Sequence, residues 1–154
     1  MKSPRRVSLC IAAFVAVADQ LTKWWVLSTM HPGRPRHLFW TLQINLTHNS
    51  GMAFSQGRGL GPVIGALAMF VIIAIVLSLH RTPSRVAVVS AGLVVGGAVG
   101  NIIDRLFRSG GFLRGEVIDF IDFKWWPVFN VADMAISIGG VLLVLTSRKV
   151  PAGA

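Results

Sequence analysis

The sequence is poor in cysteine and in charged residues. A single cysteine, Cys10, excludes an internal disulfide and gives no indication of the cellular compartment. Only 14% of the 154 residues are charged and only 6 are acidic, whereas 53% are hydrophobic. Together with a mean hydropathy of +0.65, this composition excludes an ordinary soluble domain and predicts a single integral membrane domain over residues 1–154.

Motifs of several enzyme classes are also absent. The chain has no His-Glu-x-x-His segment, its 4 histidines lack a convincing zinc spacing, and no glycine-flanked serine or cysteine accompanies a histidine base. The glycine-rich run at residues 96–100 lacks the Lys-Ser/Thr of a phosphate-binding loop. We therefore expect no metal site, no cofactor and no serine or cysteine nucleophile.

The net charge of +9 could indicate nucleic-acid binding. The basic residues, however, gather in short clusters beside apolar runs, a pattern that favours contacts with lipid headgroups. We expect membrane lipids, and no nucleic acid, as partners of these clusters.

Four apolar runs predict a mainly α-helical membrane protein. They cover residues 7–27, 61–79, 86–106 and 128–147, and about 20 helical residues cross the roughly 30 Å hydrocarbon core of a bilayer. Residues 16–18 resemble a signal-peptide cleavage site, but apolar residues continue to Leu27, so we expect the first run to remain a spanning helix. The second run contains no charge and is interpreted as a packing helix.

Four spans place both termini on one side of the membrane. Basic clusters mark that side as cytoplasmic, namely Lys2/Arg5/Arg6, Arg81/Arg85 and Arg148/Lys149. Segments 28–60 and 107–127 are then extracytoplasmic. All five tryptophans fall toward this second side, which is typical of an aromatic belt at one interface.

The first extracytoplasmic segment contains a predicted strand. Residues 40–47 alternate strictly between apolar and polar side chains, which predicts a strand with one apolar face. Residues 52–54 could form a second strand after a turn, giving a small sheet outside the helices. We expect the apolar face of Leu42 and Ile44 to rest on lipid or on substrate acyl chains. Residues 107–126 are interpreted as a loop.

The six acidic residues include several at the margins of the apolar runs. Asp119, Asp122 and Asp133 lie in or beside the fourth run, where a carboxylate is normally retained only when it is paired or used. Asn130 could cap the fourth helix, with Asp133 in the capping-box position three residues later. Capping alone would not explain Asp119 and Asp122.

Two further polar groups lie at helix ends on the same side. Asp19 and Lys23 are four residues apart, so they can form an ion pair, either as a snorkelling interfacial pair or as part of a site. Asn101, Asp104 and Arg105 share one face at the end of the third run, and their alternative interpretation is a polar helix end.

A pair of carboxylates can hydrolyse a peptide bond. One activates a water molecule while the other protonates the leaving group, and the repulsion between two close negative charges keeps one proton on the pair. We interpret Asp119 and Asp133 as this pair. Asp133, in the first turn of a helix, is expected to be the base because the helix dipole favours its charged form.

The ordered motifs of the chain resemble those of the type II signal peptidases, the bacterial lipoprotein signal peptidases. The matching segments cover nearly the whole chain and are Asp19-Gln20-Leu21-Thr22-Lys23, residues 45–54 with Asn49-Ser50-Gly51-Met52-Ala53-Phe54, Gly100-Asn101-Ile102-Ile103-Asp104-Arg105, Val117-Ile118-Asp119-Phe120 and Phe129-Asn130-Val131-Ala132-Asp133. The segment between Arg105 and Val117 is longer than expected for many members. The resemblance implies four spanning helices and an extracytoplasmic β-cradle.

The resemblance also implies an activity and a set of site residues. The family removes the signal peptide from diacylglyceryl-modified prolipoproteins in the bacterial cytoplasmic membrane, cutting before the modified cysteine, and is inhibited by globomycin-type cyclic peptides. Asp119 and Asp133 take the catalytic positions, and Asp122 does not. The supporting positions are Asp19, Lys23, Asn49, Gly51, Asn101, Asp104, Arg105 and Asn130. The alternative is a small proton- or cation-coupled transporter, which should instead place a carboxylate near the bilayer midplane.

Overall fold

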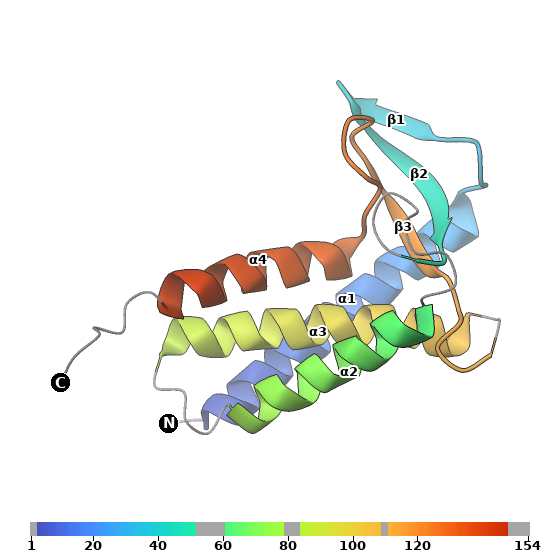
Figure 1. Ribbon diagram of the computed structural model, residues 1–154. Coiled ribbons are helices and arrows are strands. Elements are labelled where there is room, and N and C mark those ends of the chain that lie inside the picture. Colours follow the sequence, from blue (N-terminus) through green and yellow to red (C-terminus); the bar gives the residue numbers. More distant parts are fainter. Residues whose placement is uncertain (1–2, 52–60, 79–83, 109–110, 148–154) are drawn as a thin grey trace.

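The computed structural model describes residues 3–51, 61–78, 84–108 and 111–147. The helices are α1 (Pro4–Thr29), α2 (Gly61–Ser78), α3 (Arg85–Phe107) and α4 (Val131–Ser147), and the strands are β1 (Arg36–Phe39), β2 (Leu42–Asn49) and β3 (Val117–Asp122). Figure 1 shows the helices side by side, with the sheet projecting from one end of the bundle. The predicted mainly α-helical membrane fold with a small sheet is confirmed.

The helices agree closely with the predicted spans. Helices α1, α2 and α3 are long and apolar enough to cross a membrane, and α4 is a shorter apolar helix. The fourth helix begins at Val131 rather than at residue 128, because Phe129 pairs with Ile121 of β3 before the chain turns into the helix. Its 17 residues span about 26 Å at about 1.5 Å per residue.

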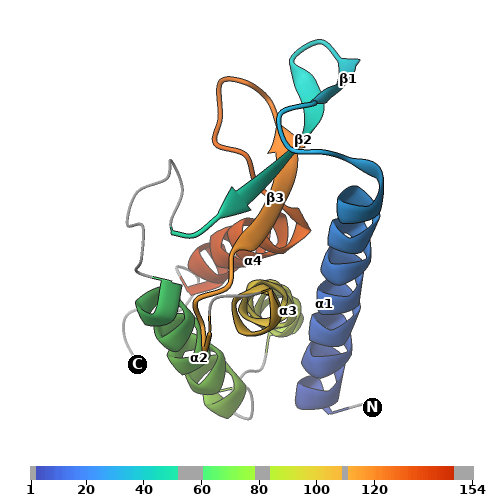
Figure 2. The same cartoon turned by 90° about the vertical axis from the view of Figure 1, so that its right-hand side faces the viewer.

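Helix α3 is the centre of the bundle, with the other helices around it (Figure 2). Its glycines allow this arrangement because they bring backbones into contact. A Cβ atom added at Gly96 would lie 2.6 Å from the carbonyl oxygen of Ala12 in α1, and one at Gly97 would collide with the carbonyl of Ala132 in α4. Such close approach is typical of helices that associate in membranes.

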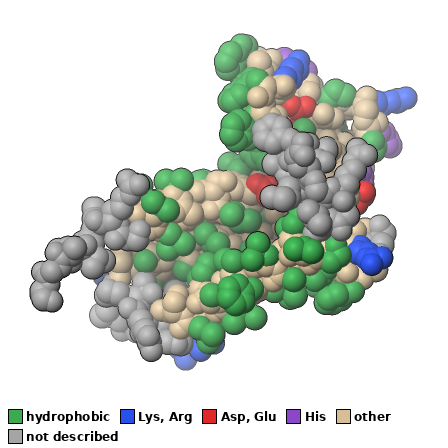
Figure 3. Space-filling view, viewed as in Figure 1, with side chains coloured by type: hydrophobic (Ala, Val, Ile, Leu, Met, Phe, Trp, Pro, Cys, Tyr) green, Lys and Arg blue, Asp and Glu red, His purple; other side chains and the backbone are tan. Residues whose placement is uncertain are grey.

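Helix α2 lies at the edge of the bundle. Only Gly61 and Gly65 are buried in it, whereas Val63, Leu67 and Phe70 are exposed. Figure 3 shows hydrophobic side chains over α2 and α4, with the visible acidic side chains confined to the end that carries the sheet. Most side chains of this uncharged helix therefore face outward, toward lipid, rather than the interior of the protein.

The sheet is antiparallel, with strand order β1-β2-β3. The predicted strand at residues 40–47 is displaced, because Trp40 adopts a positive φ of 48° in the turn between β1 and β2. Strand β1 was not predicted, and neither was β3, which lies in the segment interpreted as a loop. The possible strand at residues 52–54 lies outside the described residues.

The apolar face of β2 is buried inside the protein, so the expectation that it rests on lipid or on substrate acyl chains was wrong. Ile44 and Leu46 form a core cluster with Val26 of α1, with Met30, which caps that helix, and with Ile118 and Phe120 of β3. Alternation in a sequence indicates that one face of a strand is covered, but not by what. The sheet is therefore fastened to the end of α1 by a hydrophobic core.

We predict that Ile44→Asp strongly destabilises the protein. Ile44 is 9% exposed, and an unpaired carboxylate in this core should lower the free energy of unfolding by about 3 kcal/mol or more. The matched control is Leu38→Asp in β1, where the side chain is 51% exposed and the effect should stay within about 0.5 kcal/mol. Thermal denaturation in detergent measures both, and equal melting temperatures for the two variants would contradict the assignment of this core.

Candidate active site

Asp133 is held in the first turn of α4 by a capping box. Its backbone N–H donates to Oδ1 of Asn130 (2.9 Å), and the backbone N–H of Asn130 donates back to Oδ2 of Asp133 (3.2 Å). The predicted cap is thus confirmed. These reciprocal bonds fix the Asp133 carboxylate at the start of the helix.

Asp119 lies in β3, where it pairs with Thr47 of β2 in the strand register. Its side chain is 2% exposed and accepts two hydrogen bonds, from Nδ2 of Asn49 (2.9 Å) and from Nδ2 of Asn130 (2.6 Å). Asn49 is the last residue of β2. The sheet therefore holds both Asp119 and one of its hydrogen-bond donors.

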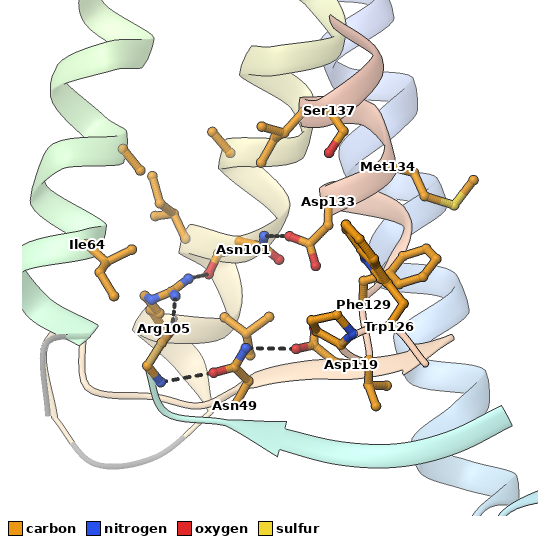
Figure 4. Close-up of a pocket in the computed structure, with 18 of the residues that line it drawn as sticks. Asn49, Ile64, Asn101, Arg105, Asp119, Trp126, Phe129, Asp133, Met134 and Ser137 are labelled. Atoms are coloured by element: carbon orange, nitrogen blue, oxygen red, sulfur yellow. Dashed lines mark hydrogen bonds between the residues drawn. The ribbon is translucent and has the colours of Figure 1, made fainter. Parts of the chain in front are cut away.

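Two asparagines connect Asp119 with Asp133. Nδ2 of Asn101, on α3, donates to Oδ1 of Asp133 (2.9 Å), and Nδ2 of Asn130 donates to Oδ1 of Asn101 (3.2 Å) as well as to Asp119. Figure 4 shows both carboxylates directed into the same cavity. The structure thus brings together two acids that come from different elements, β3 and α4.

Lys23 organises the polar residues behind this pair. Its ammonium group lies 2.8 Å from Asp19 and 2.7 Å from Asp104, and it donates to Oδ1 of Asn101 (3.0 Å). Lys23, Asp19 and Asp104 are each 0% exposed, so the snorkelling interpretation was wrong. Because Oδ1 of Asn101 accepts from Lys23, the amide nitrogen of Asn101 must face Asp133.

Asp19 and Asp104 also hold the backbone next to the two site carboxylates. Oδ1 of Asp19 accepts from the backbone N–H of Ala132 (2.9 Å), one residue before Asp133. Oδ2 of Asp104 accepts from the backbone N–H of Ile118 (3.2 Å), one residue before Asp119. Each buried acid of the Lys23 network therefore anchors the segment that carries one carboxylate of the pair.

Arg105 closes the site on the α2 side. Its guanidinium donates to the carbonyls of Gly51 and Asn101, each at 3.4 Å, and the backbone N–H of Gly51 donates to Oδ1 of Asn49 (3.0 Å). Arg105 interacts electrostatically with Asp133 and Asp119. Among the described residues that line the cavity, Arg105 is the only arginine.

The sequence interpretation missed two polar residues. Nε of Arg108 donates to Oδ1 of Asp104 (2.6 Å), and Nε2 of Gln20 donates to Oδ1 of Asp104 (3.2 Å) and to the carbonyl of Gly100 (3.1 Å). Lys23 and Arg108 together balance the charges of Asp19 and Asp104. The spacing of four residues between Asp104 and Arg108 was the available signal, because it places both side chains on one helix face.

Asp122 is separate from this site. Its carboxylate accepts hydrogen bonds from Gln43 (2.7 Å), Asn45 (2.9 Å) and the backbone N–H of Lys124 (2.6 Å). Burial raises the pKa of Asp122, but these three hydrogen bonds outweigh that effect and the pKa is lowered overall. Asp122 therefore fastens β2 to β3 as an ionised carboxylate and does not line the cavity.

The cavity has a volume of about 730 Å³ and combines a polar end with apolar walls. Asp119, Asp133 and Arg105 line its polar end (Figure 4). The walls come from α2, α3 and α4, with Ile64, Ala68, Ala98, Ile102, Met134 and Ile138 among them. In the described part of the chain, no group of three or more His, Cys, Asp or Glu residues could hold a metal ion.

Burial, and after it the neighbouring charge of Asp133, raise the pKa of Asp119 to about 7, although the hydrogen bonds from Asn49 and Asn130 act in the opposite direction. The folded protein therefore keeps a proton on Asp119 under conditions in which the unfolded chain has released it. A carboxyl group of this kind can donate a proton near neutral pH.

We predict a corresponding pH dependence of stability. Because the folded-state pKa lies above the ordinary value of 3.8, the contribution of Asp119 is fully present below 3.8 and is lost as the pH rises to about 7. Melting temperatures of the wild-type protein and Asp119→Asn, measured in detergent across this range, isolate the effect. The difference between them should change with pH, and a constant difference would contradict the raised pKa.

Comparison with known proteins decides the family. The family model described as "Signal peptidase (SPase) II" matches residues 11–149. This chain belongs to the type II signal peptidases. The enzyme is thus an aspartic endopeptidase of a bacterial membrane, and the predicted family is confirmed.

Individual relatives and solved structures agree with this membership. The lipoprotein signal peptidase of Mycobacterium avium is 40% identical over 149 residues, covering 95% of this chain and 82% of the relative. That of Rhodococcus jostii is 41% identical over 143 residues, covering 92% and 72%. A solved bacterial membrane enzyme superposes with a TM-score of 0.80 at 30% identity, covering 96% of this chain and 93% of the other.

Proposed function

We propose that this peptidase removes the signal peptide from diacylglyceryl-modified prolipoproteins by cutting before the modified cysteine, with Asp119 and Asp133 as its catalytic pair. The observation that carries the proposal is the position of the two carboxylates. They lie at the polar end of an otherwise apolar cavity and are joined through Asn130. An apolar cavity with reactive groups at one end suits a substrate that is itself embedded in lipid.

The chemistry follows from the different environments of the two acids. Asp133 accepts a proton from a water molecule, whose oxygen then forms a bond to the scissile carbonyl carbon, while Asp119 gives its proton to the carbonyl oxygen. When the tetrahedral intermediate collapses, Asp133 donates its proton to the leaving nitrogen, the C–N bond breaks, and the oxygen returns a proton to Asp119. Both carboxyl groups regain their starting states.

The other site residues support this reaction without exchanging protons. Asn49 and Asn130 orient Asp119, and Asn101 orients Asp133 under the control of Lys23. Arg105 supplies positive charge near Asp133 and Asp119, between which the negative charge of the pair moves during the reaction. Asp19 and Asp104 hold the backbone next to Asp133 and Asp119, respectively. The carbonyl of Gly51 accepts a hydrogen bond from Arg105.

The substrate is proposed to enter sideways from the lipid. The apolar walls of the cavity come partly from α2 and α4, which carry exposed hydrophobic side chains such as Phe70 and Val141. Trp125 and Trp126 are exposed beside the site and suit the headgroup level of the bilayer. A globomycin-type cyclic peptide would inhibit the enzyme by occupying the same cavity.

The proposed topology places the active site outside the cytoplasm. Helix α1 begins, and α4 ends, at the end of the bundle opposite the sheet (Figure 1). Arg5, Arg6 and Arg85 are the described members of the basic clusters that favour this end as cytoplasmic. The remaining members, Lys2, Arg81, Arg148 and Lys149, lie outside the described residues.

The test is cleavage of a purified diacylglyceryl-modified prolipoprotein by the purified protein in detergent. A new N-terminus at the modified cysteine, identified by mass spectrometry, is the expected product, and addition of a metal chelator should leave the rate unchanged. Release of no product, together with proton or cation flux in reconstituted vesicles, would support a transporter instead. The location of the acids at one end of the bundle argues against a transporter, whose carboxylate should lie near the bilayer midplane.

A further inference from the structure

One polar side chain in the cavity wall has no part in the site described above. Ser137 lies on α4 four residues after Asp133, which places both on one face of the helix, about 6 Å apart along its axis. Figure 4 shows Ser137 on the same side of α4 as Asp133. It is exposed to the cavity, among apolar neighbours such as Ala98 and Ile138.

The hydroxyl of Ser137 makes no hydrogen bond with any residue that the structure describes. Several other hydroxyls in the helices bond to a carbonyl three or four residues earlier, among them Thr22, Ser28, Thr29, Ser78 and Ser90. An exposed hydroxyl without a protein partner, in a wall that is otherwise largely apolar, is available to hydrogen-bond a group that enters the cavity. Its free donor therefore suits a partner that enters with the substrate.

A lipid-modified signal peptide brings suitable acceptors to this depth. The scissile peptide bond must leave the helix of the signal peptide before two carboxylates can reach it, and unwinding the last helical turn frees backbone carbonyls within the membrane. The ester groups of a diacylglyceryl chain carry carbonyl oxygens as well. In either case the acceptor is a carbonyl oxygen close to the cleavage site.

We propose that Ser137 is a substrate-positioning residue that donates a hydrogen bond to a carbonyl oxygen of the bound substrate, one helical turn deeper than the catalytic pair. This inference rests on the proposed function. The hydroxyl fixes how far the substrate descends along α4 and thereby which peptide bond meets Asp119 and Asp133.

The experiment compares Ser137→Ala, Ser137→Thr and the wild-type enzyme on a diacylglyceryl prolipoprotein in detergent. Loss of one hydrogen bond should raise KM about three- to tenfold with a smaller change in kcat, and Ser137→Thr should restore the wild-type KM because it keeps the hydroxyl. The matched control is Ser90→Ala, which removes a buried hydroxyl that already bonds to the carbonyl of Val86 (2.7 Å) and should leave KM unchanged.

Two modified substrates distinguish the source of the carbonyl. A dialkyl ether lipid lacks ester carbonyls, so the difference between the wild-type enzyme and Ser137→Ala disappears on it when the ester is the partner. In a second series, a thioamide, which is a weak hydrogen-bond acceptor, replaces the last helical amides of the signal peptide one at a time. When the backbone is the partner, one of these replacements abolishes the difference between the wild-type enzyme and Ser137→Ala. Either result supports the proposal.

The inference and the proposed function fail in different ways. Wild-type cleavage of the diester substrate with an unchanged KM in Ser137→Ala would overturn the inference alone, as would failure of Ser137→Thr to restore KM. A wild-type enzyme that leaves the diester substrate uncut would overturn both. Melting temperatures of all variants in detergent separate loss of substrate binding from loss of folding.

Discussion

Asp119→Asn and Asp133→Asn should each abolish cleavage in a protein that still folds. An amide has the shape of a carboxyl group but can neither take a proton from water nor share one with its partner, so we expect a loss of about a thousandfold or more in kcat. Hydrogen-bonded contacts with Asn49, Asn101 and Asn130 surround both side chains, and amide rotation preserves part of them. The measurement is the cleavage rate of a lipid-modified prolipoprotein by each purified variant.

Asp122→Asn is the matched control for the two catalytic variants. It makes the same chemical change in the same strand as Asp119, but Asp122 binds Gln43 and Asn45 across the sheet and does not line the cavity. We expect most of the activity to remain, with a loss of about 1–3 kcal/mol in stability because a donor is left unpaired. Near wild-type activity in both Asp119→Asn and Asp133→Asn, or equal inactivation by all three changes, would contradict the assignment of the pair.

Lys23→Met should be among the most destabilising single changes in the protein. The ammonium group of Lys23 neutralises Asp19 and Asp104, all three side chains are fully buried, and removal of the cation leaves two carboxylates with Arg108 as their remaining described ion-pair partner. Removing one partner from a buried ion pair typically costs about 3–5 kcal/mol. Activity should fall as well, because Asn101 loses the donor that orients its amide toward Asp133.

Thermal denaturation in detergent measures this effect, with Lys124→Met as the control. Lys124 is exposed, and its backbone N–H, which bonds to Asp122, is kept in the variant, so the melting temperature should hardly move. The double variant Lys23→Met/Asp19→Asn removes the carboxylate that Lys23→Met leaves without a described ion-pair partner, and it should recover part of the lost stability. Equal melting temperatures for Lys23→Met and Lys124→Met would contradict the stabilising role assigned to the ion pairs of Lys23.

The helices could be predicted from the sequence, whereas part of the sheet could not. The apolar runs of α1, α2 and α3 are long and nearly free of charge, so their spans differed from the observed helices by only a few residues. Strand β3 lacks alternation because five of its six residues are buried, on both faces, and two aspartates interrupt its apolar run. The period-two signal that located β2 was therefore missing in β3.

The site residues could be selected from the sequence, but their connections could not. Spacing along one helix predicted the Asp19–Lys23 pair and the Asn130–Asp133 cap, because both are local. Nothing in the sequence joins Lys23 to Asn101, which lies in a different helix. The same is true of the bonds from Asp19 to α4 and from Asp104 to β3, since long-range contacts of single polar side chains leave no periodic pattern.

The bond between Asp19 and the backbone of Ala132 has a consequence for the order of biosynthesis. Ribosomes release α1 first and α4 last, and the first turn of α4 carries Asp133 and the Asn130 amide that holds Asp119. A nascent chain with three inserted helices thus already contains Asp19, which accepts the hydrogen bond from the start of α4. It does not yet contain Asp133, so the pair of carboxylates is incomplete. With Asp119 and Asp133 as the proposed catalytic pair, peptidase activity begins only when the last helix has entered the membrane.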